Sequence, residues 1–252
     1  MQDVTFFSKA LGRKMPYRVF LPNSLPAGKK LPVVYLLHGR GADYREWSNQ
    51  SDVSLYTARG MILVMPEGYT SYFTNAAAIP KDRYQDYLTQ DLIADVERRF
   101  PAQPDREHRA IVGISMGGYG SMAIALSHPE LFVFAAGISP AVDVAERRFN
   151  WRRAGRWWQF RRALGPWDSP ERKARDPFAL AQTAVPAKTP YLYLTAGEQE
   201  PLFEPIQRFA GRLKALGFAY EFHTKPGYHD WNQWNAEIPG CFASVLAHLG
   251  LS

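Results

Sequence analysis

The chain reads Gly113-Ile114-Ser115-Met116-Gly117 directly after the apolar run 110–112 and directly before a helix-forming segment, 118–128. This is the G-x-S-x-G pattern of a nucleophile elbow, a sharp turn from a strand into a helix that lifts a serine hydroxyl clear of the sheet. Glycines stand two positions either side of the serine because a Cβ there would collide with the neighbouring strand or helix. The pattern therefore predicts an α/β fold in which Ser115 is the nucleophile.

Apolar runs and helical spacings alternate along the chain on both sides of this turn. Strands are predicted over 5–7, 17–21, 31–37, 61–65, 110–112, 132–138, 191–195 and 220–224, and helices over 84–100, 118–128, 206–216 and 238–249. The first two strands are expected to pair antiparallel, whereas continuous apolar runs are typical of strands buried on both faces of a parallel sheet. The alternation predicts a single α/β domain over 1–252, with a mainly parallel twisted sheet and helices on both faces.

One segment, 141–177, breaks the alternation and fits neither a strand nor a core helix. Arginines and aromatic residues are interleaved within it: Arg147, Arg148, Arg152, Arg153, Arg156, Arg161, Arg162, Arg172 and Arg175 with Phe149, Trp151, Trp157, Trp158, Phe160 and Trp167. Its position predicts a cap-like insertion at the mouth of the active site. We expect the tryptophans to pack on the core while the arginines extend outward. The sharper hypothesis is that Arg147 to Arg175 contacts substrate or an anionic membrane surface.

A serine nucleophile needs a base, and the base needs a carboxylate that orients it. His229 lies in the loop 226–231 between the last predicted strand and the last helix, where this class of sheet presents its chemistry. Its neighbour Asp230 is the better candidate for capping that helix. The acid should follow the strand 191–195, where Glu198 and Glu200 are both candidates, and spacing alone does not choose between them.

The negative charge that develops on the substrate oxygen needs backbone N–H donors. One donor should be the N–H of Met116, at the start of the helix after the nucleophile. The other should be the N–H of Arg40, since the loop His38-Gly39-Arg40-Gly41 is close to the H-G-G-G type of oxyanion loop. His38 is expected to support this loop. His38, Trp47 and Trp231 are also candidates for substrate contacts.

The composition limits the kinds of partner that the protein is expected to bind and the cellular compartment in which it is expected to work. The 252 residues carry a formal net charge of +6, but most of the excess lies in the insertion and no nucleic-acid-binding motif accompanies it, so a nucleic-acid partner is not expected. The single cysteine, Cys241, allows no internal disulfide and is expected to be buried. The absence of a signal-peptide pattern favours the cytoplasm, with a trimmed secreted form as the alternative.

Five stretches together resemble the putative-esterase group of the α/β-hydrolase superfamily, which includes esterase D, tributyrin-type, feruloyl and acetyl-xylan-type esterases and mycolyltransferases. They are residues 36–39 with Trp47, 84–88 with 91–92, 113–120, 197–202, and 227–231 with Trp234. In this group the acid usually stands three residues after the loop glycine, which implies Glu200. The group more often has aspartate there, which leaves Glu198 as the minority candidate. The resemblance also implies Arg40 and Met116 as the oxyanion donors.

The leading hypothesis is a serine carboxylesterase that hydrolyses a small-molecule ester through an acyl-enzyme, with Ser115, His229 and Glu200 as its triad. This chemistry requires neither a metal nor an organic cofactor. An acyltransferase, a thioesterase or a peptidase would use the same residues, because the acyl-enzyme is common to them. A non-catalytic binding protein of the same fold is the alternative from another class.

Overall fold

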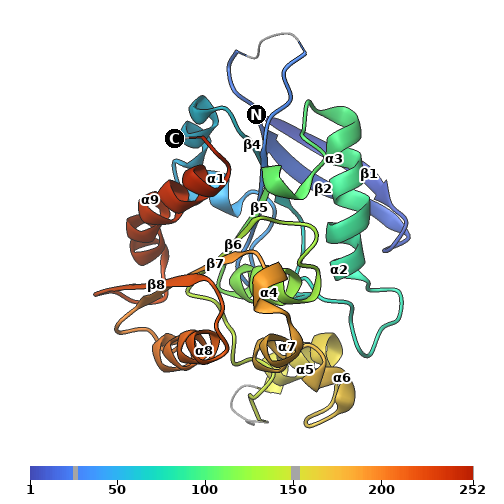
Figure 1. Ribbon diagram of the computed structural model, residues 1–252. Coiled ribbons are helices and arrows are strands. Elements are labelled where there is room, and N and C mark those ends of the chain that lie inside the picture. The colour runs from blue at the N-terminus through green and yellow to red at the C-terminus, as the bar shows by residue number, and fades with distance from the viewer. Residues whose placement is uncertain (25–27, 149–153, 252) are drawn as a thin grey trace.

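A mixed eight-stranded sheet runs through the computed structural model, which describes residues 1–24, 28–148 and 154–251. Its strands lie in the order β1-β2-β4-β3-β5-β6-β7-β8 (Figure 1). Their bounds are β1 Gln2–Ser8, β2 Arg13–Phe20, β3 Val33–Leu37, β4 Ile62–Pro66, β5 Arg109–Ile114, β6 Phe134–Ile138, β7 Tyr191–Gly197 and β8 Tyr220–Lys225. The pairs β1–β2 and β2–β4 are antiparallel and the other pairs are parallel, which confirms the predicted α/β fold with a mainly parallel sheet.

Helices cover both faces of this sheet, as predicted. They are α1 Glu46–Gln50, α2 Tyr84–Asp86, α3 Ile93–Arg99, α4 Met116–Ser127, α5 Ala154–Leu164, α6 Pro170–Lys173, α7 Pro177–Thr183, α8 Phe203–Ala215 and α9 Trp231–His248, with shorter helical turns η1 Val53–Arg59, η3 Arg106–His108 and η5 Pro186–Lys188. Val33, Tyr35 and Leu37 of β3 pack in one core cluster with α3, α4 and α8. Val34 and Leu36 pack in the other with α1 and α9, which Figure 1 shows on the opposite side. This two-sided burial explains the continuous apolar runs of the central strands.

Two predicted helices differ from the structure. The helix predicted over 84–100 is present as α2, a π-helical segment η2 (Tyr87–Leu92) and α3 in direct succession. The last helix begins at Trp231 rather than at residue 238. The Asp230 carboxylate caps it by accepting hydrogen bonds from the N–H groups of Asn232 and Gln233 at 3.0 and 3.1 Å. Trp231 and Trp234 continue the helical spacing of Ile238 and Cys241 back to this cap, a signal that the predicted start did not use.

The insertion lies between β6 and β7 and contains α5, α6 and the start of α7. The expectation for its side chains is partly wrong. Trp158 and Trp167 are 61% and 42% exposed, whereas Arg172 is only 2% exposed. The Arg172 guanidinium is buried because it donates to backbone carbonyls, and burial lowers its pKa. The acceptors are the carbonyls of Ala145, Gly165, Val144 and Arg147, at 2.8 to 3.3 Å. Four members of the predicted segment, Phe149, Trp151, Arg152 and Arg153, lie outside the described residues.

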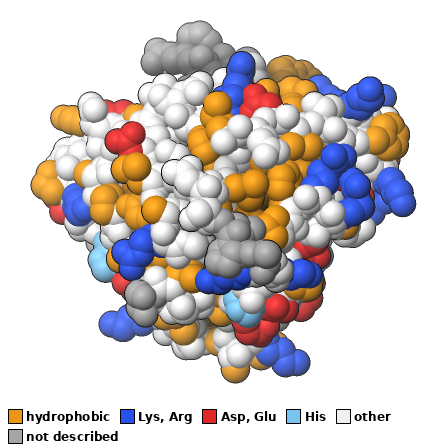
Figure 2. Space-filling model, turned by 90° about the horizontal axis from the view of Figure 1, so that it is seen from above, with side chains coloured by type: hydrophobic (Ala, Val, Ile, Leu, Met, Phe, Trp, Pro, Cys, Tyr) orange, Lys and Arg blue, Asp and Glu red, His pale blue; other side chains and the backbone are white. Residues whose placement is uncertain are grey.

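The distribution of charged side chains on the surface, the single cysteine, the helix lengths and the metal-ligating residues bear on which partners the protein can have. On the face seen in Figure 2, lysine and arginine side chains lie scattered around the rim, with acidic side chains between them and hydrophobic ones toward the centre. Cys241 is buried within α9, as predicted, and burial raises the pKa of its thiol. No helix in the described ranges combines the length and apolar character of a membrane span. The same residues contain no group of three or more His, Cys, Asp or Glu placed to hold a metal ion.

Candidate active site

Ser115 occupies a strained turn between β5 and α4. Its φ of 52° and ψ of −109° lie outside the regions that non-glycine residues ordinarily adopt. The backbone around it is held by a hydrogen bond of 3.0 Å from its N–H to the carbonyl of Ile138. A Cβ on Gly113 would lie 2.1 Å from the carbonyl oxygen of Gly117, and one on Gly117 would lie 2.2 Å from that of Leu37. The close approach of strand and helix therefore leaves room only for glycine on either side of the serine.

Three side chains from separate loops meet at this turn. The His229 Nε2 lies 2.8 Å from the Ser115 Oγ, and the His229 Nδ1 lies 2.5 Å from a carboxylate oxygen of Glu200. The Glu200 side chain is fully buried, and its second oxygen accepts a hydrogen bond of 3.1 Å from the N–H of Gly197. A carboxylate at Nδ1 favours the tautomer with its proton on that atom, which leaves Nε2 to accept the serine proton. Glu198 is exposed and lies instead 3.3 Å from the Thr224 hydroxyl.

The loops that carry the carboxylate and the imidazole are bonded to each other through their backbones. The N–H of Gln199 donates to the carbonyl of Gly227 at 3.0 Å, and the N–H of Glu198 donates to that of Lys225 at 2.9 Å. A Cβ on Gly197 would lie 2.5 Å from the Gly227 carbonyl oxygen, so the two loops are in close contact. This packing sets the separation of Glu200 and His229 independently of the two side chains.

Ser115 and His229 open into a cavity of about 530 Å³, here called the catalytic cavity. Its lining consists of Gly39, Arg40, Glu46, Tyr72, Ser115, Met116, Ala141, Asp143, Arg147, Pro201, Leu202, His229 and Trp234. Asp143 and Arg147 form an ion pair of 2.7 Å and belong to the insertion. The insertion thus borders the mouth of the site, as predicted, and contributes both signs of charge to its wall.

Two backbone N–H groups at the cavity wall are available as donors. Arg40 and Met116 both line the cavity, and in the described part of the chain neither N–H donates to a protein acceptor. The N–H of Gly39, by contrast, donates to the Glu46 carboxylate at 2.6 Å. Met116 is the first residue of α4, where the helix dipole favours negative charge. The structure therefore places both predicted oxyanion donors at the cavity that contains Ser115.

His38 does not reach the catalytic cavity. It is 1% exposed, its Nδ1 lies 2.8 Å from the carbonyl oxygen of Gly39, and its Nε2 accepts from the N–H of Gly68 at 2.9 Å. Both ring nitrogens are thus used to hold the loop that carries Arg40. The hypothesis of a substrate contact at His38 is wrong, and its expected supporting position is the one that the structure shows.

Neither Trp47 nor Trp231, the two tryptophans predicted to contact substrate, lines the catalytic cavity. Trp47 is 1% exposed and donates to the carbonyl of Leu37 at 3.0 Å, so it cannot contact substrate. Trp231 donates to Glu46 at 3.3 Å and packs edge-on against Trp234, with ring centroids 5.2 Å apart. Trp231 is absent from the lining of the described cavity, which Trp234 reaches instead. A tryptophan close in sequence to a motif can fill the core as readily as it lines a binding site.

Trp234 and Tyr72 line the catalytic cavity, although neither was predicted to have a function there. The Trp234 ring stands nearly perpendicular to the His229 imidazole, at 89° with centroids 5.1 Å apart, and so restricts its orientation. The spacing of Trp231 and Trp234 by three positions would have placed them on one helix face if the start of α9 had been predicted correctly. No comparable signal pointed to Tyr72, whose φ of 58° is itself unusual.

The sheet order, the elbow and the cavity at the carboxyl ends of the strands define an α/β-hydrolase-fold enzyme. The chain belongs to the putative esterase family, which it matches over residues 8–245. It is a carboxylic ester hydrolase, which confirms the predicted class of enzyme and the resemblance from which it was inferred.

Relatives and solved structures agree with this assignment. The chain is 25% identical to an acetyl esterase of Caldicellulosiruptor saccharolyticus, over 96% of each protein. It is 30% identical to an endo-1,4-beta-xylanase/feruloyl esterase of Xylanibacter ruminicola, over 93% of this chain but only 30% of that protein. Its fold matches the fluorophosphonate-binding serine hydrolase FphF of Staphylococcus aureus, solved with substrate bound, with a TM-score of 0.82, 25% identity and 96% of each chain covered.

Proposed function

We propose that this esterase works through an acyl-enzyme on Ser115, with His229 as general base and Glu200 as the carboxylate that orients the imidazole. The observation that carries the proposal is the continuous chain of contacts from Ser115 Oγ to His229 Nε2, at 2.8 Å, and from His229 Nδ1 to Glu200, at 2.5 Å. Both separations are short enough for the proton transfer that nucleophilic attack requires.

In the first half of the reaction, the Ser115 Oγ forms a bond to the ester carbonyl carbon while its proton passes to Nε2 of His229. The carbonyl oxygen becomes an oxyanion, which the N–H groups of Arg40 and Met116 stabilise. The bond to the alcohol oxygen then breaks, and the imidazolium protonates that oxygen. In the second half, water gives a proton to His229 and attacks the acyl carbon. The bond from that carbon to the Ser115 Oγ then breaks, the imidazolium returns its proton to Oγ, and the carboxylic acid leaves.

The cavity and the relatives support a small ester as the substrate. A volume of about 530 Å³ accommodates a small ester. Acetyl and feruloyl esters are the first candidates, because these acyl groups are named in the relatives' activities. The proposal is tested with a p-nitrophenyl ester series, from acetate to long acyl chains, together with a feruloyl ester. Mass spectrometry of acid-quenched enzyme should find the acyl group on the peptide that contains Ser115, and acylation of another residue would contradict the mechanism.

Glu200→Gln is expected to lower kcat for p-nitrophenyl acetate by about 10²- to 10⁴-fold, because an amide cannot stabilise the imidazolium as a carboxylate does. Glu198→Gln is the matched control, since it makes the same change two residues away on an exposed side chain. Steady-state rates of the two variants decide between the candidate acids. A large loss in Glu198→Gln with normal rates in Glu200→Gln would exchange their roles.

A further inference from the structure

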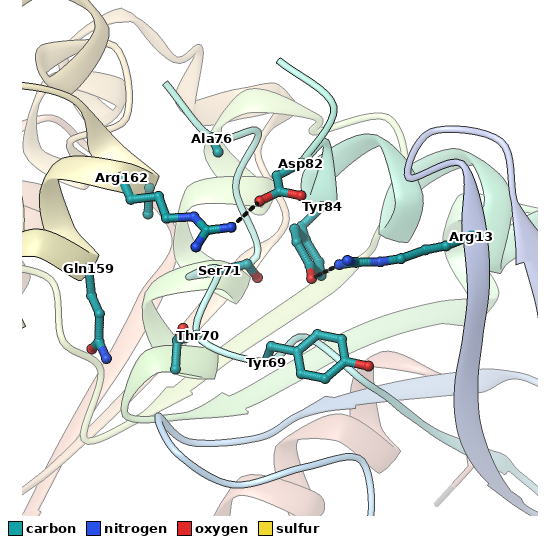
Figure 3. A pocket seen from close by; sticks show the side chains of 10 residues that line it. Arg13, Tyr69, Thr70, Ser71, Ala76, Asp82, Tyr84, Gln159 and Arg162 are labelled. Atoms are coloured by element: carbon teal, nitrogen blue, oxygen red, sulfur yellow. Dashed lines mark hydrogen bonds and ion pairs between the residues drawn. The ribbon is translucent and has the colours of Figure 1, made fainter. Parts of the chain in front are cut away.

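A second cavity of about 370 Å³ lies beside the catalytic cavity, and Figure 3 shows it from close by. It is formed by the start of β2, the segment 69–84 and one face of α5. Its lining consists of Arg13, Tyr69, Thr70, Ser71, Ala76, Asp82, Tyr84, Gln159, Arg162 and Ala163. Two arginines thus face one aspartate, which makes the wall electropositive, and none of these residues has a part in the proposed reaction.

Arg13 supplies a cation without an acidic partner. Its guanidinium donates to the hydroxyl of Tyr84 and lies 5.5 Å from the ring centroids of both Tyr69 and Tyr84. Among the described residues no carboxylate forms an ion pair with it. The two rings hold the guanidinium in place, so a bound anion would meet a preorganised charge.

The hydroxyl of Tyr84 adds a second donor at the same point. Tyr84 is buried, and burial raises its pKa to about 12, so the phenol keeps its proton at neutral pH. Since its oxygen already accepts from Arg13, the phenol proton is directed away from that bond. A guanidinium and a phenol together can bind two oxygens of one anion.

The acidic residue of this cavity does not cancel that charge. Asp82 is paired with Arg162 at 3.1 Å, which Figure 3 shows across the cavity from Arg13. This ion pair is close to neutral as a unit, so the positive charge of Arg13 is not compensated by it. In the same view Thr70 and Ser71 lie below this pair, and Tyr84 lies between Ser71 and Arg13.

The two cavities share a boundary. Arg40 lines the catalytic cavity, Gln159 lines the second one, and the Arg40 guanidinium donates to the Gln159 amide oxygen at 3.4 Å. A hydrogen bond of that length is weak and easily displaced. Ser71 of the second cavity and Tyr72 of the catalytic cavity are also adjacent in the chain. A substrate arm that displaces the Arg40 contact would pass from one cavity into the other.

We propose that the second cavity is a subsite for an anionic group, a carboxylate or a phosphate, carried on one arm of the ester substrate and bound by Arg13. The inference rests on the proposed esterase reaction for its substrate. Arg40 lies along the route, so its guanidinium assists passage of the anion while its N–H serves the oxyanion.

The test compares esters that differ only in the charge of one arm. On the alcohol side these are 4-acetoxybenzoate, 4-acetoxyphenyl phosphate and the neutral methyl 4-acetoxybenzoate. On the acyl side they are the p-nitrophenyl half-ester of suberic acid and its neutral methyl diester. In wild type we expect a higher kcat/KM for the charged member of at least one set, and Arg13→Gln should reduce that preference about tenfold. Carboxylate and phosphate members separate the two sources of charge.

Arg59→Gln is the control, because it removes the same charge from an exposed arginine at the end of η1, outside both cavities. It should leave the preference intact. Arg13→Lys keeps the charge and should retain part of the preference, which separates loss of charge from loss of folding. An equal preference in wild type, Arg13→Gln and Arg59→Gln, or no preference in either set, would overturn the subsite.

Calorimetric titration with 4-hydroxybenzoate and with 4-hydroxyphenyl phosphate gives a readout that does not depend on turnover. Binding of either anion to wild type, weakened about tenfold in Arg13→Gln and unchanged in Arg59→Gln, supports the subsite even if no ester is hydrolysed. Failure of hydrolysis for the neutral esters would count against the catalytic proposal alone. Absence of binding by both anions counts against the subsite alone.

Discussion

Ser115→Ala is expected to lower kcat/KM for p-nitrophenyl acetate by about 10⁴- to 10⁶-fold. The variant loses the atom that attacks the carbonyl, whereas the donors at Arg40 and Met116 remain in place. Alanine and serine have similar difficulty with a φ of 52°, so the free energy of unfolding should change little. Progress curves at high enzyme concentration measure the residual rate, and urea unfolding checks the fold.

The control for this substitution is Ser127→Ala, at the last position of the same helix. The Ser127 hydroxyl donates to the carbonyl of Ala123 at 2.7 Å, far along α4 from the elbow. Its removal should leave turnover and covalent labelling by a fluorophosphonate intact, whereas Ser115→Ala should abolish labelling. Ser115→Ala enzyme that still reacts with the probe at wild-type rate would mean that another residue is the nucleophile.

Gly117→Ala is expected to lower the free energy of unfolding by about 3 kcal/mol. The added Cβ would lie 2.2 Å from the carbonyl oxygen of Leu37, and main-chain atoms cannot move aside as the end of a flexible side chain can. The helix must shift away from β3, which moves the N–H of Met116. We therefore also expect kcat to fall by about 10²-fold, the usual effect of losing one oxyanion donor. Urea unfolding and steady-state rates measure the two effects.

Gly211→Ala provides the matched comparison. Gly211 also lies in a helix, α8, but an added Cβ there would meet no atom within 4 Å. Replacement should stabilise the protein by about 0.4–1 kcal/mol, because alanine loses less conformational freedom in a helix than glycine does. Equal effects of the two substitutions would show that the close approach of β3 and α4 is not what requires glycine at position 117.

Most of the sheet could be predicted because its strands are buried on both faces and therefore apolar without interruption. The strand predicted over 31–37, for example, is β3 at Val33–Leu37, and its neighbours were found in the same way. The start of α9 could not be found by this criterion. It is marked instead by the cap at Asp230 and by Trp231 and Trp234, which keep helical spacing with Ile238 but are separated by polar residues.

Some residues of the site could also be predicted from the sequence, whereas others could be assigned only from the structure. The motif predicted Ser115 as the nucleophile and the loop position predicted His229 as the base. Spacing alone left Glu198 and Glu200 as equal candidates for the acid. The structure places only Glu200 beside the imidazole, because a turn after β7 points one side chain inward and the other outward. The predicted substrate contacts of His38 and Trp47 are wrong for a related reason. Closeness in sequence to a motif does not reveal whether a side chain faces the cavity or the core.

The buried Arg172 offers a consequence for how the mouth of the site can change over evolution or in the laboratory. Its guanidinium holds the insertion by main-chain carbonyl groups, which every amino acid possesses. The path of the insertion is therefore independent of the identity of most side chains along it. Residues such as Arg147, at the rim of the catalytic cavity, can be exchanged to alter substrate preference while the contacts of Arg172 hold the backbone of the insertion. A library that varies the rim and retains Arg172 would explore new ester specificities on an unchanged framework.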